Sequence, residues 1–146
     1  MSTIAKIIVG TDGSSSAQHA VDWAVRESTT HGATLEIIHS WSLPLLVDPT
    51  GMSVFSFPVE DLSRAAEQVL NDAVSFAKSK TTSTVTGRVA QGIAANVLID
   101  ASRHADLVVV GSRGHGGFVG LLLGSVAQQV AMHSRCPVVV VPSIRD

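Results

Sequence analysis

Five short runs rich in Val and Ile recur along the chain, and longer segments with apolar residues at helical spacing separate them. The runs lie at residues 6–10, 34–39, 84–90, 106–110 and 137–141. Strands that alternate with helices are typical of a parallel sheet, and nearly continuous apolar strands indicate that helices bury both of its faces. The pattern therefore predicts an α/β fold.

Four helices are predicted between these runs. The first follows the hydroxyls of residues 14–16, which suit an N-cap, and Gly32 supplies its left-handed stop. The second spans residues 59–80, with acidic residues at its start and lysines at its end, as the helix dipole favours. The other two are shorter, at 93–103 and 125–133.

Residues 41–58 interrupt this alternation, since three prolines and a glycine break any helix there while many neighbours stay apolar. Loops of this length are usually lids, binding loops or disordered segments, and the apolar content disfavours disorder. We expect a long loop that acts as a lid or a subunit contact.

Length and charge narrow the class of protein. The chain has 146 residues, 45% of them hydrophobic, which suits one domain over 1–146 with its own core. The formal charge is −2, from ten basic and twelve acidic residues. This balance lacks the excess of positive charge that binding to nucleic acid or to an anionic membrane requires. The start of the chain has no signal-peptide pattern and no apolar stretch is long enough to span a bilayer, so we expect a cytoplasmic protein.

Ligands of open parallel sheets bind beyond the carboxyl ends of the strands, where successive crossovers leave toward opposite faces. Gly10, Thr11 and Asp12 follow the first run, and Ser40 follows the second. After the fourth run, which ends at Val110, small and basic residues gather. They are Gly111, Arg113, Gly114, His115, Gly116 and Gly117, and the loop ends at Gly124, Ser125 and Val126, where the last helix begins.

This second loop is suited to phosphate. The start of a helix presents unpaired N–H groups, and small residues let phosphate oxygens approach them. Gly111 and Gly114 would permit the turn away from the sheet, Gly116 and Gly117 would leave amides unobstructed, and Ser125 would contact phosphate or cap the helix. Glycines also occur in plain loops, and Asp12 is equally suited to capping the first helix, so residue chemistry alone leaves both interpretations open.

The spacing Gly111-x2-Gly114-x9-Gly124-Ser125 resembles the nucleotide signature of the universal stress protein family, in its ATP-binding branch. Similar features extend over the chain: IIVGTDGS at 7–14, ADLVVVGSRG at 105–114, and LLGSVAQQVAMHSRCPVVVVP at 122–142. The resemblance implies a Rossmann-like fold, similar to the adenine nucleotide α-hydrolases, with an open five-stranded parallel sheet in the order 3-2-1-4-5.

The resemblance also implies roles for these residues. Asp12, flanked by Gly10 and Thr11, would lie near the ribose and phosphates and hold Mg²⁺ through the nucleotide, while Ser40 would meet the adenine through its backbone. Val110 would precede a phosphate-binding set formed by Gly111, Gly114, Gly124, Ser125 and Val126. Separately from the resemblance, Arg113 and His115 lie inside this loop and their charge would offset that of the phosphates, although basic side chains are also common in exposed loops. The cofactor would be ATP, ADP, AMP or cyclic AMP. A homodimer through residues 137–142 is implied too, and it would cover an apolar edge strand.

The expected function is therefore that of an adenine-nucleotide-binding regulator of the stress response. It is not an enzyme, and ATP turnover is slow or absent, because no Gly-x-x-x-x-Gly-Lys-Ser/Thr element occurs. Two alternatives stay open. The hydroxyl-rich segment 11–16 suits the phosphate loop of a flavodoxin-like electron carrier, and an interaction module that binds no nucleotide would need none of these loops.

Overall fold

The computed structural model describes residues 3–43, 46–47, 49–51, 53–54, 58–113 and 123–143. Its elements are β1 (Lys6–Gly10), α1 (Ser15–His31), β2 (Thr34–Trp41), β3 (Leu46–Val47), β4 (Ser53–Val54), α2 (Val59–Lys80), β5 (Val85–Gln91), α3 (Ala94–Ala101), a 3-10 turn (Ser102–His104), β6 (Leu107–Gly111), α4 (Ser125–His133) and β7 (Val138–Val141). Five strands pair in parallel in the order β5-β2-β1-β6-β7. Numbered among themselves, these strands have the order 3-2-1-4-5, so the predicted fold is confirmed.

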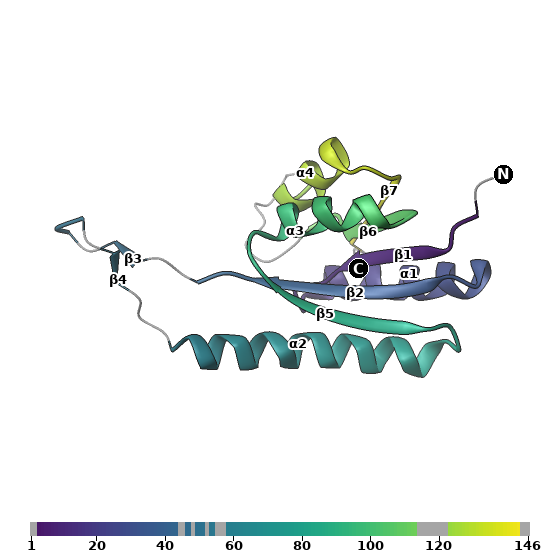
Figure 1. Cartoon of the computed structure of the whole chain (residues 1–146), viewed down its shortest axis with the longest axis horizontal. Helices are drawn as coiled ribbons and strands as arrows, with labels where there is room; N and C mark the ends of the chain where they lie inside the picture. The colour runs from purple at the N-terminus through teal and green to yellow at the C-terminus, as the bar shows by residue number, and fades with distance from the viewer. Residues whose placement is uncertain are drawn as a thin grey trace.

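The core lies on both faces of the sheet, because successive residues of a strand point to opposite sides. Ile7 and Val9 of β1 pack with α1 and α2, whereas Ile8 packs with α3 and α4. All three side chains are fully buried. Figure 1 shows α2 along one side of β2 and β5, with α3 and α4 together on the other side of the sheet. Among the helices of the described part, none combines the length and the apolarity that crossing a bilayer requires.

Most predicted boundaries agree with the structure. The helices at 59–80 and 125–133 begin and end at the expected residues, and β2 extends to Trp41. The third helix is shorter than expected, since α3 ends at Ala101 and the chain tightens into the 3-10 turn. The segment 41–58 is not only loop, because β3 and β4 pair in antiparallel fashion within it. Gly51, at φ 84°, permits the chain reversal between them.

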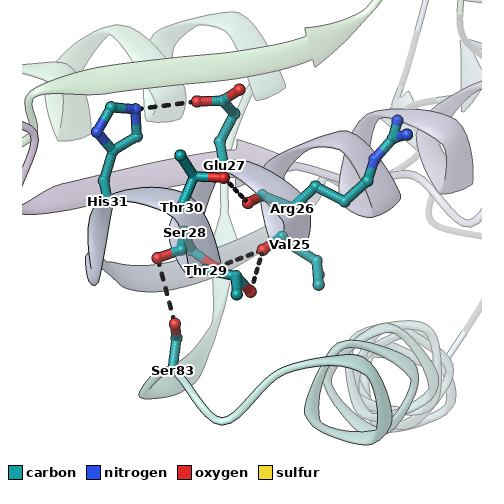
Figure 2. Close-up of polar contacts among 8 residues, drawn as sticks. All are labelled: Val25, Arg26, Glu27, Ser28, Thr29, Thr30, His31 and Ser83. Carbon is teal, nitrogen blue, oxygen red and sulfur yellow. Dashed lines mark hydrogen bonds and ion pairs between the residues drawn. The ribbon is translucent and has the colours of Figure 1, made fainter.

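The end of α1 is fastened by hydroxyl groups (Figure 2). Ser28, Thr29 and Thr30 each donate a hydrogen bond to a main-chain carbonyl one turn earlier in the helix. Ser83, just before β5, donates to the Ser28 carbonyl at 3.2 Å. Gly32 then ends the helix at φ 64°, which confirms the predicted left-handed stop. These contacts tie α1 to the segment that leads into the edge strand.

Candidate functional site

β1 and β6 are neighbours in the sheet, and the connections that follow them leave toward opposite faces. β1 leads into α1 on the face that α2 also covers, and β6 leads toward α4 on the opposite face. This is the topological switch point at which open α/β sheets bind their ligands. The segments that follow β1 and β6 therefore both begin at the carboxyl edge of the sheet.

The first loop is tied to the neighbouring strand. Thr11 is only 9% exposed, and its amide donates to the Ile38 carbonyl of β2 at 3.0 Å. Its hydroxyl accepts from the Gly13 amide at 3.2 Å, and Gly13 takes the left-handed φ of 82°. A Cβ on Gly13 would lie 3.3 Å from Val69 of α2, so the turn is also closely packed.

Asp12 does not cap α1. Ser14 is the N-cap, and its hydroxyl oxygen accepts from the Ala17 amide at 3.2 Å, as residues 14–16 led us to expect. Asp12 instead forms a local turn, in which its Oδ1 accepts from the Ser14 amide at 2.9 Å. The carboxylate is half-buried at the end of β1, which is compatible with the ligand role implied by the resemblance.

Ser40 lies at the end of β2, next to Ala90 of β5. The alternation of the strand places it on the face of the sheet that Ile38 shares with α3 and α4. Gly10 is on the same face, because a Cβ there would meet the tip of Leu98 of α3 at 2.7 Å. Leu98 of α3 therefore packs directly over Gly10, and Ser40 lies on the same face at the end of the neighbouring strand.

Gly111 does not serve as the predicted turn away from the sheet. It is the last residue of β6, still paired with Val141, and it is not among the described glycines with positive φ. The absence of a side chain at Gly111 instead allows Ser16 of α1 to pack against β6. A Cβ at Gly111 would lie 2.8 Å from the Ser16 hydroxyl and 3.1 Å from the Ser16 carbonyl oxygen. The preceding residue, Val110, is buried in the core beneath α4.

The two ends of the second loop are fastened to each other, because the Gly124 amide donates to the Ser112 carbonyl at 2.6 Å. Gly124 is also the N-cap of α4, in an extended conformation and without a side-chain cap. Ser125 is therefore the first residue of the helix, and its predicted capping role is wrong, since the cap must precede the helix. The Gly124 amide is engaged by the Ser112 carbonyl, so the predicted role of Gly124 in phosphate binding would depend on the space that it leaves before the helix.

Three other amides at the start of α4 remain available to a ligand. Those of Ser125, Val126 and Ala127 have no acceptor within the helix, and the first intrahelical bond runs from the Gln128 amide to Gly124. Ser125 is exposed, while Val126 is half-buried against the apolar cluster between α3, α4 and the sheet. This first turn therefore presents amides of the kind that bind an anion.

The remaining predicted residues are only partly described. Gly114, His115, Gly116 and Gly117 lie outside the described residues, whereas Arg113 is half-buried just before them. No group of three His, Cys, Asp or Glu side chains suited to a metal occurs in the described ranges. Asp12 fits Mg²⁺ only as a single carboxylate beside phosphate oxygens, which is the usual way proteins hold this ion with a nucleotide.

Several side chains that shape these loops were not predicted. The His39 ring hydrogen-bonds the Thr11 carbonyl at 2.8 Å. Ser112 and Ser16, both nearly buried, are joined by Ser143, whose amide donates to the Ser112 hydroxyl and whose hydroxyl donates to that of Ser16. No sequence signal distinguished them, because β2 also contains Thr34, Glu36 and Ser40, and His39 and the serines acquire their partners through tertiary contacts.

The fold defines a Rossmann-like α/β protein, and the candidate site lies at its topological switch point. The sequence narrows this class further, because residues 3–142 match the model of the Universal stress protein family. The chain belongs to that family, as the resemblance in its sequence predicted.

Relatives and solved structures agree with this assignment. Universal stress protein Rv2623 of Mycobacterium tuberculosis is 36% identical over 137 residues, which cover 93% of this chain and 44% of the relative. The chain spans about half the length of the curated relatives it matches. The universal stress protein UspA from Lactobacillus plantarum has a TM-score of 0.82 at 22% identity, over 97% of this chain and 99% of that one. A universal stress protein in complex with cAMP has a TM-score of 0.74 at 29% identity, over 98% and 100%.

Proposed function

We propose that this protein binds an adenine nucleotide, ATP foremost, and uses its occupancy to regulate a stress response. The phosphates lie at the start of α4 and beside Asp12, which shares Mg²⁺ with them, and the adenine lies against the end of β2 at Ser40. ADP, AMP and cyclic AMP share the adenosine part and are the competing ligands. Turnover of ATP is slow or absent.

One observation carries this proposal. Asp12 and the start of α4, which has no side-chain cap, follow neighbouring strands whose connections leave toward opposite faces of the sheet. Asp12 follows β1, and Gly124 is held against Ser112 at the end of β6. Adjacent strands lie about 5 Å apart, so both elements are within reach of one nucleotide. The 29%-identical universal stress protein in complex with cAMP supports an adenine nucleotide as the ligand class.

The family assignment, and not the first loop, disfavours the flavodoxin-like alternative. The Thr11 and Ser14 hydroxyl oxygens accept hydrogen bonds from the Gly13 and Ala17 amides, and the Ser16 hydroxyl accepts from Ser143. Each of these hydroxyls therefore keeps its own hydrogen for donation.

The test uses position 124, where φ −68° and ψ 166° suit any residue. Asp and Asn are both preferred N-caps, so Gly124→Asp and Gly124→Asn should both retain α4. Only Asp places a negative charge before the first-turn amides. At a separation of about 6 Å and an effective dielectric constant of about 20, this repulsion is on the order of 2 kcal/mol, which corresponds to about 30-fold in affinity.

Calorimetric titration at low salt should therefore show weaker ATP binding for Gly124→Asp than for Gly124→Asn. Adenosine, which has no phosphate, should bind both variants alike. Equal ATP affinity of the two variants would place the phosphates elsewhere. Mass spectrometry of small molecules that accompany the purified protein identifies the ligand, and yellow protein carrying flavin would favour the electron carrier.

We also propose a homodimer that forms through residues 137–142, a lid or subunit contact at 41–58, and a single domain in the cytoplasm. β7 is the edge of the sheet, pairing within the described chain with β6 alone, and three of its four valines are only half-buried. An apolar edge of this kind is covered in stable proteins. Light scattering at micromolar concentration tests the dimer, and a monomeric mass would overturn it.

A further inference from the structure

His39 lies near the end of β2, and its ring Nδ1 is 2.8 Å from the main-chain carbonyl oxygen of Thr11. A carbonyl oxygen only accepts hydrogen bonds, so Nδ1 carries a hydrogen and donates it. The Thr11 amide is also bonded to β2, through the Ile38 carbonyl. Both main-chain groups of Thr11 are thus held by the strand beside it.

This pair of bonds orients the next peptide unit. The Thr11 carbonyl and the Asp12 amide belong to one planar trans unit, in which the C=O and N–H bonds point in opposite directions. Because the carbonyl points to His39, the Asp12 amide points away from it. β6, which carries the second loop of the site, flanks β1 on the side opposite β2.

We propose that His39 is a positioning residue for nucleotide binding, which fixes the Thr11–Asp12 peptide so that the Asp12 carboxylate faces the bound phosphates. This inference rests on the function proposed above. His39 itself does not touch the nucleotide, because strand alternation places it on the α1 and α2 face with Ile37, opposite Ser40. In this proposal two neighbouring residues at the end of β2 have different roles: Ser40 contacts the base, and His39 orients the loop that contains Asp12.

Two substitutions separate the hydrogen bond from the size of the side chain. His39→Asn retains a nitrogen donor at the δ position, whereas His39→Leu fills similar space without a donor. Without the donor, the loop adopts its binding orientation for a smaller fraction of the time, and the apparent Kd rises by the inverse of that fraction. A single neutral hydrogen bond supports a change of about 3- to 10-fold.

Calorimetric titration with Mg-ATP should show this rise for His39→Leu and near-native affinity for His39→Asn, with thermal unfolding recorded to confirm that both variants fold. Native affinity for His39→Leu, or equal losses for both variants, would overturn the positioning role. If the parent protein binds no adenine nucleotide, the function proposed above fails instead.

A second measurement does not depend on nucleotide. In the unliganded protein, long-range nitrogen–proton NMR correlations should place the hydrogen of the neutral His39 ring on Nδ1. His39→Leu should accelerate hydrogen exchange of the Gly13 and Ser14 amides, which bond within this loop, and His39→Asn should not. A neutral ring protonated at Nε2, or unchanged exchange in His39→Leu, would show that the loop is held without His39.

Discussion

The sharpest structural prediction concerns Gly111, at the end of β6. A Cβ at this position would approach the Ser16 hydroxyl to 2.8 Å, the Ser16 carbonyl oxygen to 3.1 Å and the carbonyl carbon to 3.3 Å. The hydroxyl can rotate away, but the carbonyl belongs to the first turn of α1 and moves only if the helix moves. Gly111→Ala should therefore force α1 away from the sheet.

Gly10 offers the matched control, since it is also the last residue of a central strand. Its Cβ would approach Leu98 Cδ1 even more closely, at 2.7 Å, but that atom is the tip of a flexible side chain. Both substitutions reduce the entropy of the unfolded chain alike, so their difference reports the native contacts. Overpacking costs about 1–3 kcal/mol, and we expect Gly111→Ala to lose about 2 kcal/mol more than Gly10→Ala.

Urea unfolding measures this difference. With an m-value of about 2 kcal/mol/M, the midpoint of Gly111→Ala should lie about 1 M below that of Gly10→Ala, at an unchanged m-value. Adding Ser16→Ala removes the 2.8 Å contact but leaves the carbonyl, so the double variant should recover part of the loss. A Gly111→Ala midpoint at or above that of Gly10→Ala would refute the argument that backbone contacts are the costly ones.

Two further predictions concern single side chains. Asp12→Asn keeps the side-chain oxygen that accepts from the Ser14 amide but removes the negative charge. Mg²⁺ should therefore no longer change the affinity for ATP, while the affinity measured in EDTA should not fall. An unchanged Mg²⁺ effect would exclude Asp12 as a ligand of the ion. Burial raises the pKa of the Cys136 thiol above its ordinary value, the Ser134 hydrogen bond opposes the shift and Asp106 adds to it. Less thiolate forms, so iodoacetamide near pH 8 should alkylate Cys136 more slowly in the folded than in the urea-unfolded protein, and equal rates would contradict this.

The fold was predictable because its signals are local. The apolar runs, the acidic start and basic end of α2, and Gly32 after α1 each act within a few residues of the element they define. They therefore fixed the number, type and order of the main elements. The β3–β4 pair was missed because its strands have only two residues each, which is too short for a period to appear.

The placement of the candidate residues at one edge of the sheet was predictable, but their contacts were not. Glycine and aspartate at the strand ends indicated the carboxyl edge of β1 and β6, whereas the contacts that they make depend on residues distant in the sequence. Position 111 has no room for a side chain because Ser16 packs against it, and the Gly124 amide donates to the Ser112 carbonyl. His39 gained its partner only when β1 and β2 came to lie side by side. None of these pairs leaves a pattern in the sequence.

Around the candidate site, the strands that flank β1 and β6 bond to the segments that follow them. β2 holds the first loop, through Ile38 and His39. At the other side the end of β7 holds the second loop, because the Val141 carbonyl accepts from the Ser112 amide at 2.8 Å, and the Ser143 amide donates to the Ser112 hydroxyl. The Ser143 hydroxyl also donates to that of Ser16 in the first turn of α1, so the segment after β7 is bonded to the elements that follow both β1 and β6. Affinity for a ligand at the candidate site should therefore depend on β2 and β7 as well as on the loops that touch it.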